Sequence, residues 1–235
     1  MTTKTFAETL DEAFDQINRM DASLGERLQA FADTVRKLDS SFAEAVDRLV
    51  ARLKEKGAGE AAPEPGDVMP SFLLPDDQGH LVSLEELLEK GPVALAFHRG
   101  HWCPYCRINT NALVEAQSKA EAEGGQIAAI LPERRQFATE LKSAFKAPFP
   151  ILLDMDNGYA MSLNLAIWVG EEMKKLMSSA GWDLPRYQGN DAWMLPIPAT
   201  FVVGRDGRVA ARFVDPDYRK RMAVEAMLDA LKAAH

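Results

Sequence analysis

Two cysteines, Cys103 and Cys106, are the only thiols in this 235-residue chain, and two residues separate them. An apolar run at 93–97 precedes them and predicts a strand buried on both faces. A helix is predicted over 104–122, so Cys103 lies at its N-terminus, where the helix dipole and free backbone N–H groups lower the pKa of a thiol. Cys106 follows one helical turn later on the same face, where it can attack a mixed disulfide or sulfenic acid formed on Cys103. The pair therefore predicts thiol redox chemistry.

The residues that flank the pair favour this chemistry. Pro104 suits the first position of a helix, which needs no N–H donor, and Trp102 stands directly before the first cysteine. His98, Arg99 and His101 lie just upstream. Either histidine is a candidate proton donor, with a surface or hydrogen-bonded histidine as the alternative. Arg99 is a candidate positive charge beside the thiols, with a solvated loop arginine as the alternative.

A metal site is the competing interpretation of the same segment. His98, His101, Cys103 and Cys106 offer nitrogen and sulfur ligands of the kind that zinc prefers. One Cys-x-x-Cys without a second pair is half of a zinc site, however, and four ligands within nine residues would be cramped. A structurally inert pair is a third interpretation. We favour the redox pair and expect neither a metal nor a cofactor.

The composition excludes several other classes of protein. The chain carries 27 Lys and Arg against 35 Asp and Glu, a net charge of −8, which argues against a nucleic-acid or anionic-membrane binder. Two cysteines are too few for a disulfide-stapled secreted scaffold. The sequence does not begin with a basic and then apolar leader, and no run approaches the roughly eighteen apolar residues of a membrane span. We therefore expect a soluble cytoplasmic protein.

Residues 1–56 are predicted to form two or three helices. Apolar residues recur there in steps of three and four, and three hydroxyl–Glu pairs have the spacing of a capping box: Thr5 with Glu8, Ser23 with Glu26, and Ser41 with Glu44. The apolar stripe predicts either a helical flap on the chain's own domain or a homodimerisation arm. A Gly- and Pro-containing linker at 57–66 separates this extension from a domain at 67–235.

The second region has the alternating pattern of an α/β fold. Strands are predicted at 72–74, 93–97, 127–131, 149–153, 200–203 and 208–214, with helices at 83–90, 104–122, 134–146, 158–165, 171–180 and 219–234. Asp206-Gly207 predicts a hairpin turn between the last two strands. We interpret the basic cluster 219–221 as surface at the start of the closing helix. Trp168, Trp182 and Trp193 are interpreted as core, with a substrate-cleft wall as the alternative.

The sequence resembles the thioredoxin fold, and more closely the peroxiredoxin-like branch of the AhpC/TSA family. The segments that carry the resemblance are 66–72, 97–106, 195–201, 205–207 and 213–218. The resemblance implies a central mixed sheet flanked by helices, preceded here by the helical extension. It implies that Cys103 attacks the substrate, that Cys106 resolves the oxidised form, and that a thioredoxin- or glutaredoxin-type dithiol is the reductant. It also implies that Pro198 is cis and faces the pair, and that Pro198 and Thr200 shape the substrate site.

Two departures from the family pattern leave the reaction open. Ala96 and Gly100 stand where peroxiredoxins have a proline and a Thr or Ser, and Pro198 aligns near their second active-site arginine. In peroxiredoxins, the Thr or Ser and the arginine hydrogen-bond the peroxide. Three hypotheses follow: a thiol peroxidase, a thiol–disulfide oxidoreductase, and a non-enzymatic redox or metal sensor.

Overall fold

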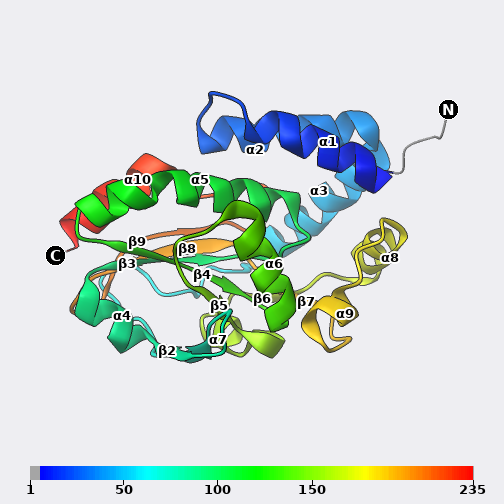
Figure 1. The fold of residues 1–235 in the computed structure, drawn as a ribbon. Coiled ribbons are helices and arrows are strands. Elements are labelled where there is room, and N and C mark those ends of the chain that lie inside the picture. Colours follow the sequence, from blue (N-terminus) through cyan, green and yellow to red (C-terminus); the bar gives the residue numbers. More distant parts are fainter. Residues whose placement is uncertain (1–5, 235) are drawn as a thin grey trace.

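The computed structural model describes residues 6–234. Five strands form the central sheet: β3 (Val93–Phe97), β4 (Gln126–Leu131), β5 (Ile151–Leu153), β8 (Ala199–Val203) and β9 (Val209–Val214). Their order is β5-β4-β3-β8-β9 (Figure 1). Strands β3, β4 and β5 run parallel, β8 is antiparallel to β3, and β9 is antiparallel to β8. The mixed sheet is confirmed, and β3, buried at all five positions, has the predicted bounds.

Helices cover both faces of this sheet. The first face carries α5 (Pro104–Ala122), α6 (Arg135–Phe145) and α10 (Val224–Ala233), and the second carries α4 (Leu84–Lys90) and α7 (Gly158–Ser162). Because side chains alternate along a strand, Ala94 and Ala96 pack toward the first set of helices, and Leu95 and Phe97 toward the second. The small alanines let α5 approach the sheet closely, so the end of β3 and the start of α5 are fixed relative to each other.

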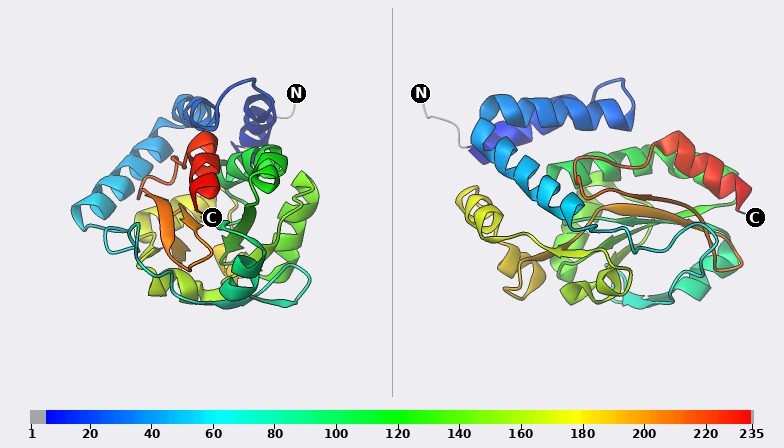
Figure 2. Two further views of the ribbon diagram at one scale, coloured as in Figure 1. Left: turned by 90° about the vertical axis from the view of Figure 1, so that its left-hand side faces the viewer. Right: turned by 180° about the vertical axis from the view of Figure 1, so that it is seen from behind.

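Three N-terminal helices form a further layer, namely α1 (Phe6–Asn18), α2 (Leu24–Leu38) and α3 (Ser40–Glu55). Figures 1 and 2 show α1 and α2 lying across α5, outside the sheet layers. Their buried apolar stripe joins one hydrophobic cluster with the start of α5 and with α8 (Glu171–Ser179). Ion pairs from Arg107 to Asp11 and from Arg27 to Glu115 fasten the layer to α5. The stripe is therefore used within the chain, as the flap interpretation expected.

The helix starts test the predicted capping boxes. Ser23 caps α2 and forms the predicted box with Glu26. The box at Ser41 is wrong, because the Asp39 carboxylate accepts the Phe42 N–H at 2.9 Å and starts α3 earlier. The proposed pair of Thr5 and Glu8 lies outside the described residues.

Several short elements were not predicted. They are β2 (Leu81–Ser83), the 3₁₀ helix η1 (Met155–Asn157), α9 (Leu184–Gln188), and the antiparallel pair β6 (Ala166–Trp168) and β7 (Met194–Pro196). Strand β2 pairs with β1 (Leu73–Pro75), which overlaps the predicted strand at 72–74. The closing helix α10 begins at Val224 instead of residue 219, so 215–223 form a loop. Segment 57–66 lies against β9, where the Arg212 guanidinium donates to the Ala62 carbonyl at 2.6 Å.

Pro198 departs from the expectation. No peptide bond between the described residues is cis, so the Ile197–Pro198 bond is trans. The Ile197 N–H donates to the Leu165 carbonyl at 2.8 Å, between the end of β7 and the start of β8.

Within residues 6–234, no helix combines the length and the apolar character that a bilayer crossing requires.

Candidate active site

The turn between β3 and α5 places Cys103 as the N-cap residue of α5, with Pro104 at the first helical position. The Cys103 N–H donates to the Gly100 carbonyl at 3.2 Å. Gly100 has a φ of 149°, a value that residues with a side chain rarely adopt. A Cβ there would lie 2.7 Å from the Glu133 carboxylate and closer still to the Trp102 indole nitrogen. The turn therefore requires glycine where peroxiredoxins carry Thr or Ser.

Both thiols are free and buried, with 1% of Cys103 and none of Cys106 exposed. The Cys106 sulfur accepts the Arg99 backbone N–H at 3.3 Å and the Arg221 Nη2 at 3.2 Å. Cys103 makes no side-chain capping bond to α5. The two sulfurs thus have different surroundings, and the N–H donors converge on the second one.

This difference affects the pKa values of the two thiols. Burial raises the pKa of Cys103 well above its ordinary value. Burial also opposes a charge on Cys106, but the Cys103 thiol, Arg221 and the Arg99 N–H together hold the pKa of Cys106 well below its ordinary value. The helix start is therefore not the only influence on these thiols, because specific donors contact the Cys106 sulfur.

Arg221 is a site residue that sequence reasoning missed. It belongs to the 215–223 loop, is only 8% exposed, and donates through Nη1 to the carbonyls of Tyr218 and Lys220 at 2.6 Å. The interpretation of 219–221 as surface is therefore wrong for Arg221. A run of three basic residues looks like a solvated face in sequence, and nothing local marks which of them turns inward.

Arg99 is buried beside the pair, so the solvated-loop alternative is wrong. Its guanidinium lies 3.8 Å from the ring centroid of Tyr218 and 5.1 Å from that of Trp102. Burial disfavours its charge, but Cys103, Tyr218 and Cys106 raise the pKa of Arg99, which stays protonated. The pair is thus flanked by two buried guanidinium groups, Arg99 and Arg221.

His98 is a buried, hydrogen-bonded histidine. Its Nε2 lies 2.9 Å from the Asn109 amide nitrogen, and its Nδ1 lies 3.4 Å from the Thr110 hydroxyl. That hydroxyl donates to the Cys106 carbonyl at 2.9 Å, so it accepts the Nδ1 proton. Burial lowers the pKa of His98 to about 4. The ring is neutral at pH 7, and both of its nitrogens are occupied within the fold.

His101 is held by Glu133, a second residue that the sequence did not reveal. The fully buried Glu133 carboxylate accepts the His101 backbone N–H at 2.7 Å and lies 2.9 Å from Nδ1 of its ring. The ring also stacks on Phe137, with centroids 4.8 Å apart. Burial raises the pKa of Glu133. The dyad holds the turn that precedes Trp102.

A narrow pocket of ≈ 20 Å³ lies over Cys103, with room for about one water molecule. We call it the cavity. Arg99, Trp102, Cys103 and Tyr218 line its inner side. Its cover comes from the N-terminal helices and α8, and includes Leu10, Phe31, Val35, Phe42, Met173 and Met177. Trp182 also lines it, which supports the cleft-wall interpretation for that tryptophan. Apart from the polar arginine and tyrosine groups, the lining is apolar.

The other predicted site residues lie apart from this cavity. Pro198 and Thr200 are buried at the start of β8, where Thr200 is the register partner of Ala96 in β3. Neither of them, nor His98 or His101, is among the described residues that line the cavity. Across residues 6–234, no group of three or more His, Cys, Asp and Glu side chains is arranged to hold a metal ion.

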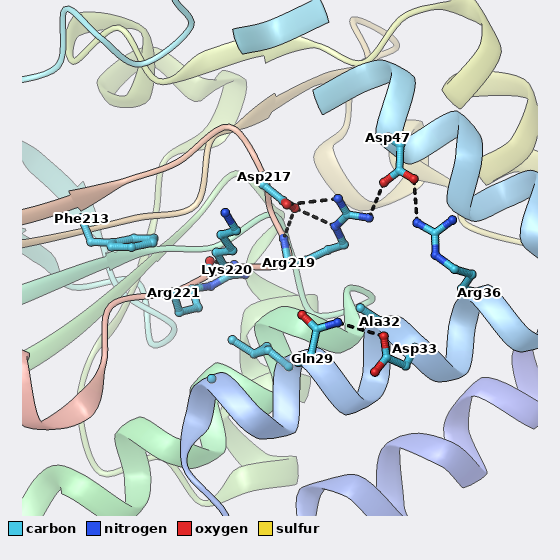
Figure 3. A pocket seen from close by; sticks show the side chains of 12 residues that line it. Gln29, Ala32, Asp33, Arg36, Asp47, Phe213, Asp217, Arg219, Lys220 and Arg221 are labelled. Atoms are coloured by element: carbon cyan, nitrogen blue, oxygen red, sulfur yellow. Dashed lines mark hydrogen bonds and ion pairs between the residues drawn. The ribbon is translucent and has the colours of Figure 1, made fainter. Parts of the chain in front are cut away.

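A second hollow of ≈ 390 Å³ lies between α2, α3 and the 215–223 loop (Figure 3). A chain of ion pairs crosses it: Arg36 bonds Asp47 at 2.6 Å, Asp47 bonds Arg219 at 2.7 Å, and Arg219 bonds Asp217 at 2.7 Å. We call this chain the clasp. It ties the N-terminal helices to the loop that carries Tyr218 and Arg221.

Comparison with known protein families identifies the family of this chain. The sequence pattern of the AhpC/TSA family matches residues 65–212. The chain belongs to the AhpC/TSA family. It is therefore an oxidoreductase, like the other members of that family. The AhpC/TSA match contains both cysteines and Arg99, but the N-terminal helices, Tyr218 and Arg221 lie outside it.

Solved structures show the same fold as this AhpC/TSA protein. Peroxidoxin BcpB from Mycobacterium tuberculosis is 19% identical over 74% of this chain and 99% of its own, with a TM-score of 0.57. A cysteine-to-serine mutant of peroxiredoxin 6 from Arenicola marina is 15% identical over 72% of this chain and 71% of its own, at 0.55. Peroxiredoxin Q from Xanthomonas campestris is 15% identical over 69% of this chain and 90% of its own, at 0.52. The thioredoxin-like fold is thereby confirmed. No curated protein sequence matches the chain significantly.

Proposed function

We propose that the protein is a thiol-dependent peroxidase. Cys103 attacks the outer oxygen of a hydroperoxide and becomes a sulfenic acid, Cys106 closes a disulfide with it, and a thioredoxin- or glutaredoxin-type dithiol restores the pair. The observation that carries the proposal is the narrow cavity over Cys103, with Arg99 in its wall. A peroxide group is small enough for this space, whereas the disulfide of a folded protein is not.

The two buried arginines support peroxide chemistry despite the departures from the family pattern. Breaking the O–O bond develops negative charge on the departing oxygen, which fixed cations in a dry site stabilise. Arg99 lies in the cavity wall, and Arg221 reaches the neighbouring sulfur at 3.2 Å. Together they supply the charge that peroxiredoxins draw from an arginine near the position of Pro198. Trp102 and Pro104 shape the cavity, while Pro198 and Thr200 support the strand behind it. The proposal gives His98 no proton-donor role, because both ring nitrogens are engaged.

Thiol–disulfide exchange is the second candidate. The observation in its favour is the position of the pair in the first turn of α5, since two thiols one helical turn apart form a local disulfide without a large rearrangement. Attack on a protein disulfide would require the cover of N-terminal helices to open, because Cys103 is only 1% exposed.

Stopped-flow kinetics distinguish the two candidates. The rates of peroxide consumption and of protein-disulfide reduction are measured for the wild type, Cys103→Ser and Cys106→Ser. We expect rapid peroxide consumption by the wild type, none by Cys103→Ser, and a single turnover by Cys106→Ser. A wild type that reduces disulfides briskly but barely consumes peroxide overturns the peroxidase proposal. Unchanged activity in Cys103→Ser overturns both candidates.

A further inference from the structure

We propose that the Tyr218 hydroxyl is the proton donor to the oxygen that departs when Cys103 attacks a hydroperoxide. The inference rests on the proposed function for the reaction and for the attacking sulfur. It adds a catalytic residue from the 215–223 loop, outside the segment that matches the AhpC/TSA family. It also gives that residue the role for which His98 and His101 were the candidates in the sequence.

The departing oxygen needs a proton. Reduction of a hydroperoxide releases hydroxide or an alkoxide, and each is a far stronger base than a phenolate. The cavity over Cys103 measures ≈ 20 Å³, so a bound peroxide group leaves little room for water beside it. A side chain in the cavity wall that donates the proton would speed the step by about 10²–10⁴-fold.

Few groups in the cavity wall can donate a proton. Among the described residues that line the cavity, those with a polar hydrogen other than Cys103 are Arg99, Trp102, Tyr105, Trp182 and Tyr218. A guanidinium stays protonated in proteins, and an indole N–H donates hydrogen bonds without giving up its proton. The two phenols are therefore the candidate acids.

Arg99 distinguishes the two phenols. Its guanidinium lies 3.8 Å from the centroid of the Tyr218 ring. A phenolate spreads its negative charge into its ring, so this cation stabilises Tyr218 after the proton has left. Tyr105 instead packs edge-on against Phe31, with centroids 5.1 Å apart. Burial raises the pKa of both phenols, and Arg99 opposes that rise at Tyr218.

The 215–223 loop fixes Tyr218 through its backbone and leaves its hydroxyl available. The Tyr218 carbonyl accepts the Arg221 Nη1 at 2.6 Å, and the clasp contains the residues on both sides of Tyr218. Among residues 6–234, none accepts a hydrogen bond from the Tyr218 hydroxyl. Tyr159 differs, because its hydroxyl donates to the Pro70 carbonyl at 2.7 Å. The Tyr218 proton is thus free to pass to a substrate oxygen.

The step balances in protons and electrons. The Cys103 thiolate forms a bond to the outer oxygen of ROOH, and the O–O bond breaks with both of its electrons on the inner oxygen. The sulfur is oxidised and the peroxide is reduced. The inner oxygen takes the Tyr218 proton and leaves as ROH, so the protein holds a sulfenic acid and a phenolate beside Arg99. The phenolate then recovers its proton from solvent.

Two oxidants with different leaving groups test the proposal by stopped flow, in single turnovers with reduced protein in excess. Hydrogen peroxide releases hydroxide, which needs a proton, whereas peracetic acid releases acetate, which is stable without one. Tyr218→Phe keeps the ring over Arg99 and removes the hydroxyl. We expect this variant to react with hydrogen peroxide about 10²-fold more slowly or worse, and with peracetic acid at close to the wild-type rate.

Tyr105→Phe is the matched variant, because it removes the other phenol of the cavity wall. It should change the rates with both oxidants by the same factor. An equal loss with both oxidants in Tyr218→Phe overturns the proposal, and so does a loss specific to hydrogen peroxide in Tyr105→Phe alone. A wild type that consumes neither oxidant overturns the proposed function and this inference with it, whereas rapid wild-type consumption with an equal loss in Tyr218→Phe overturns this inference alone.

Discussion

The segment that matches the AhpC/TSA family and the segments outside the match contribute different things to this site. Residues within 65–212 supply the two sulfurs, the glycine turn and Arg99. Segments outside the match supply most of the cavity cover, from α1–α3, and the 215–223 loop with Tyr218 and Arg221. The segment shared with the family thus carries the two sulfurs. The segments outside the match control access to these sulfurs and supply part of the charge around them. The fold alone therefore does not specify how such a site is tuned.

The largest effect should come from opening the cover. Phe31 is 1% exposed and contacts Tyr105 edge-on at 5.1 Å, so Phe31→Ala should destabilise the protein by about 3–5 kcal/mol in chemical denaturation. Phe149→Ala, at an equally buried position in the sheet core, is the matched control. Both should lose stability, but only Phe31→Ala should speed alkylation of Cys103 by a thiol reagent under native conditions. Equal alkylation rates in the two variants would contradict the role of α1–α3 as a cover.

A somewhat smaller effect concerns His98 within the matched segment. Burial lowers the pKa of His98 from 6.5 to about 4, so the unfolded chain binds the extra proton more readily. The stability that a neutral His98 provides is full above pH 6.5 and is lost as the pH falls toward 4, a change of about 3 kcal/mol. The measurement is the free energy of unfolding against pH for the wild type and His98→Gln.

The difference between those two proteins isolates His98 from the carboxylates that titrate in the same range. It should shrink as the pH falls from 6.5 to 4. A constant difference over that range would show that His98 is not buried neutral.

The glycine turn should give an intermediate effect. Gly100→Ala places a Cβ against Glu133 at a φ of 149°, which should cost about 1–3 kcal/mol and shift the helix start that holds Cys103. Gly25→Ala is the control, because nothing lies within 4 Å of its added Cβ and its helical backbone accepts alanine. Thermal unfolding of both variants measures the effect. A Gly100→Ala protein as stable as Gly25→Ala would refute the requirement for glycine.

Breaking the clasp should give the smallest change in stability. It tests whether the segments outside the match influence the thiols inside it. Arg219 is partly exposed, so Arg219→Ala should cost at most about 1 kcal/mol. It should nevertheless raise the pH at which Cys106 titrates in the Cys103→Ser background, because Arg221 lies in the same loop. Arg48→Ala, which removes an exposed ion pair to Glu172, should leave that titration unchanged. Identical Cys106 titrations in Arg219→Ala and Arg48→Ala, followed by the ultraviolet absorbance of the thiolate, would show that the clasp does not influence the thiols.

The sequence predicted those elements whose signals are local. The apolar run gave β3 its bounds, Pro104 marked the start of α5, and Ser83 and Ser23 marked two further helix starts. Strands β6 and β7 were not predicted, because each has only three residues and its partner lies far along the chain. The late start of α10 was not predicted, because residues 219–223 contain no helix breaker.

The site was predictable in its cysteines and in Arg99, Trp102 and Pro104, which line the cavity. The partners of each sulfur are set by tertiary contacts over long separations, such as Arg221 with Cys106, and neither spacing nor charge pattern in one sequence reveals them. The trans bond at Pro198 was missed for a related reason. The expectation rested on the partnership of that proline with the cysteine pair, whereas the neighbouring strand β7 fixes the backbone there.

The clasp of Arg36, Asp47, Arg219 and Asp217 also has a meaning for descent. A relative that lost α3 would lose the Asp47 carboxylate and would need a new partner for Arg219 in the 215–223 loop. Substitutions at these four positions should accordingly occur together in members of the family.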